Sequence, residues 1–573
     1  MATTGSRAEA TARLYVAPVD GAAELFTPAF ADYLVRLHDE FSTRVRALRD
    51  RRAEVLTRAL THGTPPTDPP ASEARTGNWR VPPVPDELQT PGIEISGPCS
   101  VTSMFINALN PGPEGERAEG DLDDDEDSAA HRLVDTVQAA RNRLAAVNRE
   151  LTYVDREKGK RYTIAEGDLP FFMHRERGLH LDEPDVRVDG TAVPAAILGT
   201  ALTLFYAGRA QAGRGQGIYF YLHKLEAADE ARLYRDLFDR SRALLPFLGN
   251  AVIRAIVLVE SLPCVYQMEE MLWALGPYAA GLNAARWDLK ASIFEYVMAD
   301  PKAVWPDRFG VDIKTTPFLA NIFRRLVAVC LKRGAVPVGG MATALPSADP
   351  EVNRVAAEAI RADKQWEAAQ GFLRAWVAHI FHMKTAADPF RTLRASGWKP
   401  TAAMADPDNY PVTIEVPAGP ITLGGTRRNC RMVIEYLEGW LNGRGAKGID
   451  SLAGKPGIHP ALMEDLATGR MSVAQIAQRI RHHARAADSP APHDFPLVKR
   501  LLEEEVEDIL GRLRATVADD RGKAAYAQTE ERYRKAVKIA LRWIRNYTEL
   551  NFRSLGSYTR ADLDAIAAAP DTF

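Results

Sequence analysis

Hydrophobic residues near the start of the chain recur with helical spacing. Between Phe30 and Leu60 the apolar positions follow a period close to that of an α-helix, and the run ends at Thr61-His-Gly. This spacing predicts one long amphipathic helix. Residues 63 to 94 hold many prolines and few apolar runs, which predicts an extended connection rather than a second core. We therefore expect an N-terminal helical clasp and a proline-rich linker over residues 1–92.

Between residues 93 and 424, short β-prone runs alternate with helical stretches. The runs are FFMHRER, IYFYLHK, AVIRAIVLVES, GLNAARWD, VPVGGMA and WVAHIF. Alternation of this kind predicts βαβ units and a parallel sheet. Polar residues stand where several of these runs stop, namely Arg177, Lys224, Glu260 and Asp288. Because the chemistry of a parallel barrel lies at the carboxyl ends of several strands, this pattern favours a TIM (β/α)8 barrel over a doubly wound sheet.

After residue 425 the hydrophobic pattern is wholly helical. The amphipathic stretches are CRMVIEYLEGWLNG, MSVAQIAQRIRHHA, FPLVKRLLEEEVEDILGRL and ERYRKAVKIALRWIRNYTELN. They predict an all-helical C-terminal domain over residues 425–573, with a loose tail after Leu563. The predicted fold class is therefore α/β, a TIM barrel with an N-terminal helical segment and a C-terminal helical domain.

Composition and charge favour a folded protein that acts on small molecules. Of the 573 residues, 46% are hydrophobic and 26% are charged, as in ordinary globular proteins. The formal charge of −3 provides no basic field, so we expect neither nucleic acid nor a membrane as a partner. The sequence shows no leader-like segment and no long apolar span, and we expect a cytoplasmic protein. The oligomeric state stays open.

Two further features receive structural interpretations. Residues 113–127 end in the acidic run AEGDLDDDED, which predicts an exposed barrel loop with solvated charge at Asp121 to Asp124. No GxGxxG or GxxxxGK[ST] motif follows a predicted strand, so a dinucleotide or P-loop site is not expected. The pair Gly339-Gly340 is interpreted as a tight turn at a strand end.

Glu260 and Asp288 are candidate ligands for a hard cation. Oxygen ligands suit Mg²⁺, an ion that usually keeps water or substrate in its remaining positions. The alternative is that each acid pairs with an arginine or caps a helix. Two acids at strand ends of one predicted barrel favour the metal site.

The motifs that carry these residues also resemble the malate synthase family, most closely its shorter A-type form. They run in the family's order from Ile93 to Thr468: IEISGP, INALN, DDEDS, RERGLHL, GIYFYLHK, LVESLPCVYQMEEML, GLNAARWD, PDRFGVD, VGGMA, RADK, WVAH and LMEDLAT. The resemblance implies an acyltransferase of the glyoxylate bypass. In this reaction acetyl-CoA condenses with glyoxylate in the presence of Mg²⁺, and hydrolysis of the thioester then yields malate.

The resemblance assigns roles to individual residues. It implies Glu260 and Asp288 as metal ligands, Arg177 as the active-site arginine, and Asp465 in LMEDLAT as the general base, carried by the C-terminal domain. These roles agree with the chemistry, since a carboxylate with a raised pKa can remove a proton beside a thioester carbonyl. A fixed guanidinium can stabilise the developing enolate oxygen.

The resemblance also implies substrate contacts, with Ala285, Trp287, Asp288 and Arg177 as the residues that bind the 2-oxo acid. An acidic loop that lines the family's site matches Glu126 and Asp127, to which we give supporting weight only.

Several positions depart from the family's motifs. Ala285 stands where GLNCGRWD has a glycine, His223 replaces the proline of YFYLPK, and Lys290 adds a cation after Asp288. Residues 370–384 lack the family's His-Asp-Gly and Pro-Gly, near the region that receives coenzyme A. After Asp465, LATGRMSV replaces AATAEISR.

These departures leave two alternatives open. One is a similar condensing enzyme with a changed acyl donor or 2-oxo acid in specialised metabolism. The other is a non-catalytic ligand-binding homologue, against which the retained acids, arginine and base argue.

Overall fold

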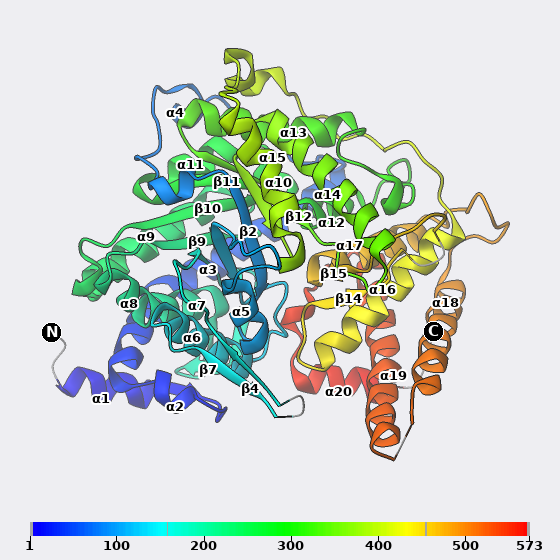
Figure 1. Cartoon of the computed structure of the whole chain (residues 1–573), viewed down its shortest axis with the longest axis horizontal. Helices are drawn as coiled ribbons and strands as arrows, with labels where there is room; N and C mark the ends of the chain where they lie inside the picture. Colours follow the sequence, from blue (N-terminus) through cyan, green and yellow to red (C-terminus); the bar gives the residue numbers. More distant parts are fainter. Residues whose placement is uncertain (1–3, 157–158, 453–454, 519, 570–573) are drawn as a thin grey trace.

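The computed structural model describes residues 4–156, 159–452, 455–518 and 520–569. Within them, parallel strands close into a barrel in the order β10-β11-β12-β13-β2-β3-β6-β9 (Figure 1). These strands are β2 Gly92–Pro98, β3 Gly120–Asp124, β6 Phe171–Arg175, β9 Ile218–Leu222, β10 Ile253–Val259, β11 Ala279–Ala284, β12 Val336–Ala342 and β13 Arg374–Val377. The predicted TIM barrel is confirmed.

The barrel strands are buried on both faces. The β10 sequence IRAIVLV is almost wholly apolar, because helices cover the outside of the barrel and side chains fill its inside. The covering helices and their neighbours are α5 Thr102–Leu109, α6 Leu133–Val147, α7 Ala195–Phe205, α8 Ala207–Gly213, α9 Ala228–Leu244, α10 Leu262–Val265, α11 Met268–Leu275, α12 Arg286–Val297, α13 Pro317–Arg333, α14 Pro350–Gln370 and α15 Met383–Ala395.

A buried carboxylate occupies the barrel interior. Glu94 on β2 is fully buried and accepts hydrogen bonds from Arg374, from the Tyr221 hydroxyl at 2.5 Å and from the Trp376 ring nitrogen at 3.1 Å. Buried charge is tolerated where it is paired and hydrogen-bonded in this way. Arg374 is therefore part of the packed interior of the barrel.

The N-terminal segment contains α1 Thr4–Arg13, α2 Ala22–Leu25 and α3 Pro28–His62. The long helix α3 confirms the predicted amphipathic helix. Thr27 caps its first turn, its hydroxyl accepting from the Phe30 amide at 3.3 Å, and α3 ends at Gly63 in the left-handed region. The proline-rich connection that follows contains the short helix α4 Glu73–Thr76 and the 3-10 helix η1 Asp86–Gln89.

Short antiparallel sheets lie outside the barrel. β1 Leu14–Val16 pairs with β7 Asp182–Val188, which pairs in turn with β8 Thr191–Pro194. The other two sheets each contain two strands, β4 Thr152–Asp155 with β5 Lys160–Thr163, and β14 Lys447–Ile449 with β15 Leu462–Glu464.

The C-terminal part is helical, as predicted, and packs against one side of the barrel (Figure 1). Its helices are α16 Leu423–Leu441, α17 Leu466–Arg481, α18 Phe495–Ala515, α19 Asp520–Thr548 and α20 Arg560–Ala568. Helix α17 lies against α12 of the barrel. The expectation of a loose tail after Leu563 does not hold up to Ala568, because these residues belong to α20, where Asp564 pairs with Lys535 of α19 at 2.7 Å. The rest of that prediction, residues 570–573, lies outside the described residues.

The prediction of an exposed acidic loop is wrong for Asp121 to Asp124. These residues form part of β3 and are buried. Arg143 on α6 donates to Asp123 at 2.5 Å, and Arg175 donates to both oxygens of Asp124 at 2.7 and 2.6 Å. Arg143 and Arg175, which lie far along the chain, compensate the charges of Asp123 and Asp124. Because these arginines are distant in sequence, the acidic run itself could not show that its residues would be buried.

The glycine pair also differs from its prediction. Gly339 and Gly340 lie within β12 rather than in a turn. A Cβ added at Gly340 would come within 2.4 Å of Arg286, and one at Gly339 within 2.4 Å of Glu367. The glycines thus leave room for the Arg286–Glu367 ion pair. In the part of the chain that the structure describes, each helix is too short or too polar to cross a membrane.

Candidate active site

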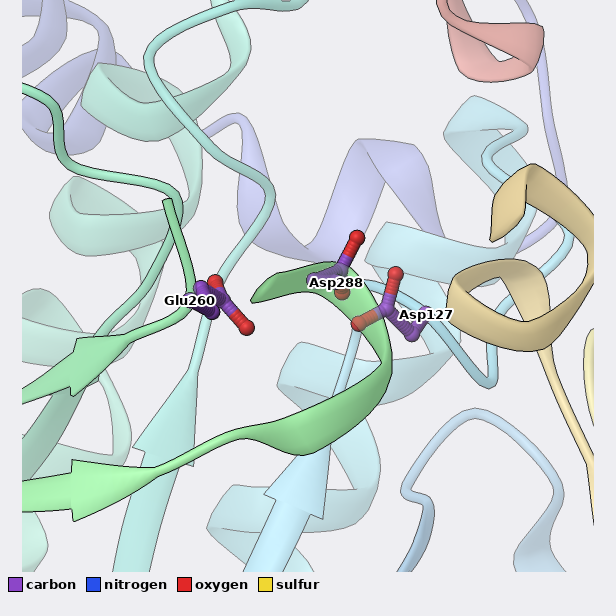
Figure 2. Close-up of side chains that lie close together, drawn as sticks. All are labelled: Asp127, Glu260 and Asp288. Carbon is purple, nitrogen blue, oxygen red and sulfur yellow. The ribbon is translucent and has the colours of Figure 1, made fainter. Parts of the chain in front are cut away.

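Three carboxylates meet at the carboxyl end of the barrel (Figure 2). Glu260 directly follows β10, Asp288 lies in the first turn of α12, and Asp127 lies three residues beyond β3. One oxygen from each carboxylate lies within 4.8 Å of the others, and all three residues are buried. The structure thus brings the predicted Glu260 and Asp288 together and adds Asp127 to them.

A lysine partly compensates this cluster. Lys224 Nζ lies 2.7 Å from Glu126, 2.8 Å from Asp127 and 3.2 Å from Asp288. Its backbone amide donates to Glu260 at 2.5 Å, and it adopts a left-handed φ of 50°. Burial alone would lower the pKa of Lys224, but the surrounding carboxylates, led by Asp127 and Asp288, raise it well above its usual value.

Negative charge still exceeds positive charge in the cluster. Burial, reinforced by Asp288 and Asp127, raises the pKa of Glu260 well above its usual range despite the opposing effect of Lys224. Burial and then Glu126 also raise the pKa of Asp127. Carboxylates that retain protons in this way can exchange them for a cation. The converging oxygens therefore fit Mg²⁺, which prefers such ligands.

Asp465 reaches this cluster from the C-terminal part of the chain. It precedes α17 as its N-cap and accepts from the Ala467 amide at 3.1 Å. Two residues before Asp465, the Met463 amide donates to the Thr343 carbonyl at 2.7 Å, just beyond β12. This bond holds the segment against the barrel mouth.

Asp465 and the metal cluster line the same cavity. This cavity of about 50 Å³ has Asp127, Glu260, Asp288 and Asp465 in its wall. Burial raises the pKa of Asp465 well above its usual value, and Asp127 and then Asp288 raise it further, whereas Arg175 opposes them. The geometry places a carboxylate of raised proton affinity beside the acidic cluster.

Of the predicted substrate contacts, Ala285, Trp287 and Asp288 lie at this cavity and Arg177 does not. Ala285 and Trp287 both line it, and Ala285 is the N-cap of α12. The apolar part of the wall comes from Met341, Trp376 and Met463. A small polar ligand here would meet a helix N-terminus on one side and apolar side chains on the other.

The structure does not bring Arg177 to the cluster. Its guanidinium donates to Glu183 at 2.6 Å and to the His131 carbonyl at 3.4 Å, and it is absent from the cavity wall. Arg175 lines the cavity instead, and its Nη1 lies 3.4 Å from Asp127.

Alternation along β6 explains why Arg175 reaches the cavity. The His174 ring contacts Asp123 at 2.7 Å and Gln211 at 3.0 Å, beneath the covering helices, so the next side chain points to the other face of the strand. The period of two does not separate Arg175 from Arg177, because β6 ends at Arg175 and Arg177 lies beyond it. The resemblance assigned the role to Arg177, and the structure places Arg175 at the cavity instead.

The residues that depart from the family's motifs differ in how deeply they are buried. Lys290 Nζ donates to the Val311 carbonyl at 2.9 Å, and burial lowers its pKa to about 7. His223 is buried and contacts the Glu176 carbonyl at 2.6 Å. In segment 370–384, Phe372 and Arg374 are buried whereas Phe381 is 38% exposed, so only part of this change lies at the surface.

Comparisons with known proteins agree with this arrangement. A model described as malate synthase, TIM barrel domain, matches residues 171–408, and one described as malate synthase, C-terminal, matches residues 420–559. Malate synthase of Streptomyces clavuligerus is 35% identical over 94% of this chain and 96% of its own length. Malate synthase A of Escherichia coli (strain K12) is 32% identical over 86% of this chain and 89% of its own.

Among solved structures, the lead(II) complex of Haloferax volcanii malate synthase aligns with a TM-score of 0.39 and 12% identity, over 68% of this chain and 90% of that one. The sequence relatives carry the assignment. A TIM barrel with a buried acidic cluster and a helical C-terminal domain defines the class of protein. The chain belongs to the malate synthase family, a family of acyltransferases.

Proposed function

We propose that this chain catalyses the Mg²⁺-dependent condensation of an acyl thioester, by default acetyl-CoA, with glyoxylate, followed by hydrolysis to malate. One observation carries the proposal: Asp465 shares a cavity with Asp127, Glu260 and Asp288. Condensation at an aldehyde carbonyl needs a base near the donor carbon and a Lewis acid at the acceptor oxygen. The family membership supports the same reaction.

The carboxylates of Glu260, Asp288 and Asp127 would hold the metal. Bound Mg²⁺ would supply Lewis acidity at the aldehyde oxygen. The backbone amides at the start of α12, which follows Ala285, would donate to the carboxylate of the 2-oxo acid. Trp287, in the same cavity wall, would limit the size of that acid.

Asp465 would act on the donor. Its carboxylate removes a proton from the carbon beside the thioester carbonyl, and its raised pKa makes it a stronger base. We assign stabilisation of the enolate oxygen to Arg175 rather than Arg177, because Arg175 lines the cavity. The enolate carbon then bonds to the aldehyde carbon, the π electrons of the aldehyde move to its oxygen, and this oxygen takes up a proton to become the hydroxyl of the product. Water cleaves the thioester, and the coenzyme leaves as a free thiol.

A second candidate is a similar condensation with a changed donor or 2-oxo acid. Two observations favour it, the altered segment 370–384 and the methyl group of Ala285 in the cavity wall. In the altered segment, Ile380 and Phe381 line a space of about 10 Å³ together with Gly112, Pro113 and Glu114.

The test is release of free thiol from acetyl-CoA when glyoxylate and Mg²⁺ are added to the pure full-length chain. We expect release that stops when EDTA removes the metal. If folded protein releases no thiol, acetyl-CoA with glyoxylate is not its substrate pair. A panel of acyl thioesters and 2-oxo acids then tests the second candidate. A chain that binds Mg²⁺ and glyoxylate without turning over any pair would be a non-catalytic homologue.

A further inference from the structure

A guanidinium from the C-terminal part of the chain lies on the metal cluster. Arg470 Nη1 donates to Asp288 Oδ1 at 2.8 Å, and Nε and Nη2 donate to Glu295 at 2.9 and 2.6 Å. The Tyr547 hydroxyl donates to the same Glu295 at 2.9 Å. Asp288 and Glu295 both belong to α12, whereas Arg470 belongs to α17, the helix that begins after Asp465. One side chain therefore joins the helix of the candidate base to a candidate metal ligand.

Both oxygens of Asp288 face positive charge. Oδ1 accepts from Arg470, and Oδ2 lies 3.2 Å from Lys224 Nζ. A divalent cation that binds Asp288 must compete with the charges of Arg470 and Lys224. Because the site is buried, this repulsion lowers the affinity for the cation strongly.

Arg470 also has room to move away from Asp288. It lines a cavity of about 590 Å³ that reaches Glu260 and Lys224 on one side and Trp543 and Leu550 on the other. The guanidinium can therefore turn toward this space while its bonds to Glu295 remain. Those bonds, together with the packing of α17 on α12, connect the two helices, and Tyr547 on α19 also donates to Glu295.

We propose that Arg470 is an internal counter-cation of the metal site. It neutralises Asp288 while no metal is bound and releases this carboxylate to a divalent cation, while its pair with Glu295 keeps the helix of Asp465 docked. The inference rests on the proposed function for the position of the metal. It goes beyond that function because it makes metal affinity depend on a residue outside the ligand set.

The first test measures Mn²⁺ binding to the metal-free full-length chain by titration calorimetry. We expect Arg470→Gln to bind Mn²⁺ roughly tenfold more tightly than the original chain, since a neighbouring cation shifts a charged site by about one logarithmic unit. Arg470→Lys should stay close to the original affinity. Arg481→Gln is the matched control, because Arg481 ends the same helix and donates to the Thr548 carbonyl.

Unchanged or weaker Mn²⁺ binding in Arg470→Gln overturns the proposal, as does a failure of both chains to bind Mn²⁺. If the variant does not fold, a crystal structure of the unsubstituted chain with Mn²⁺ decides the matter. We expect Arg470 to contact Glu295 alone in that structure, and a guanidinium still bonded to Asp288 beside the metal contradicts the inference. Neither measurement needs turnover. A chain that binds Mn²⁺ as expected but makes no malate refutes the proposed function alone.

Discussion

Removal of the Lys224 charge tests the electrostatic account of the site. In Lys224→Met the side chain keeps a similar length and loses its ammonium group. That group lies 2.7 Å from Glu126, 2.8 Å from Asp127 and 3.2 Å from Asp288. Loss of one partner from a buried ion pair costs roughly 3–5 kcal/mol, because the remaining charge is left uncompensated. Three buried carboxylates lose a partner here, so we expect a cost in this range.

Thermal unfolding of Lys224→Met, followed by intrinsic fluorescence with EDTA and with saturating Mg²⁺, measures this cost. With EDTA the variant should melt well below the original chain. Mg²⁺ should raise its Tm more than it raises that of the original chain, because the bound ion supplies the missing charge. Lys384→Met is the control, since Lys384 pairs with Asp388 at the surface, where an ion pair contributes little. Equal melting with EDTA, or an equal Mg²⁺ effect in both chains, refutes the reasoning.

Three other predictions follow from single residues. Burial, with Asp123 next, raises the pKa of Asp121 well above its usual value, so the folded chain holds this proton more tightly than the unfolded chain. The contribution of Asp121 to the free energy of unfolding should therefore fall by about 1.4 kcal/mol per pH unit as the pH rises above the ordinary aspartate pKa. Thermal melts at about pH 5 and pH 7 should show this loss of stability in the original chain and a smaller loss in Asp121→Asn. Arg175→Lys should lower kcat by about 100-fold or more and Arg177→Lys far less, in the same thiol assay; equal losses would contradict the assignment of Arg175. Asp465→Asn should abolish turnover without weakening Mn²⁺ binding, and residual turnover near the original rate would exclude Asp465 as the base.

The periodicity of the sequence was sufficient to predict most of the fold. Helix α3 shows a clear helical period, and strands such as β10 are apolar runs that end in a polar residue. Strand β3 was not predicted, because acidic residues are rare in buried strands. Two of its carboxylates, Asp123 and Asp124, are compensated by Arg143 and Arg175, which lie 20 and 51 residues away along the chain.

From the sequence pattern alone, only those residues of the candidate site that directly follow a predicted strand could be predicted. Glu260 and Asp288 follow apolar strands, and the structure places both in one cluster. Asp465 could be predicted as the base only from the family resemblance, because a carboxylate directly before a helix is usually interpreted as its N-cap. Asp465 does also cap α17, since it accepts a hydrogen bond from the Ala467 amide. Arg470 could not be found from sequence, because its contact with Asp288 depends on how α17 packs on α12.

The most direct test of the central claim is the stoichiometry of the reaction. The pure chain is incubated with acetyl-CoA, glyoxylate and Mg²⁺, while free thiol is measured by absorbance and malate by mass spectrometry. We expect the two products to form in equal amounts, and both to disappear in Glu260→Gln and Asp465→Asn variants that remain folded. Thiol without malate would reveal a thioesterase instead of a condensing enzyme. Equal formation of both products by Asp465→Asn and the original chain would contradict the joint site of barrel and C-terminal helix.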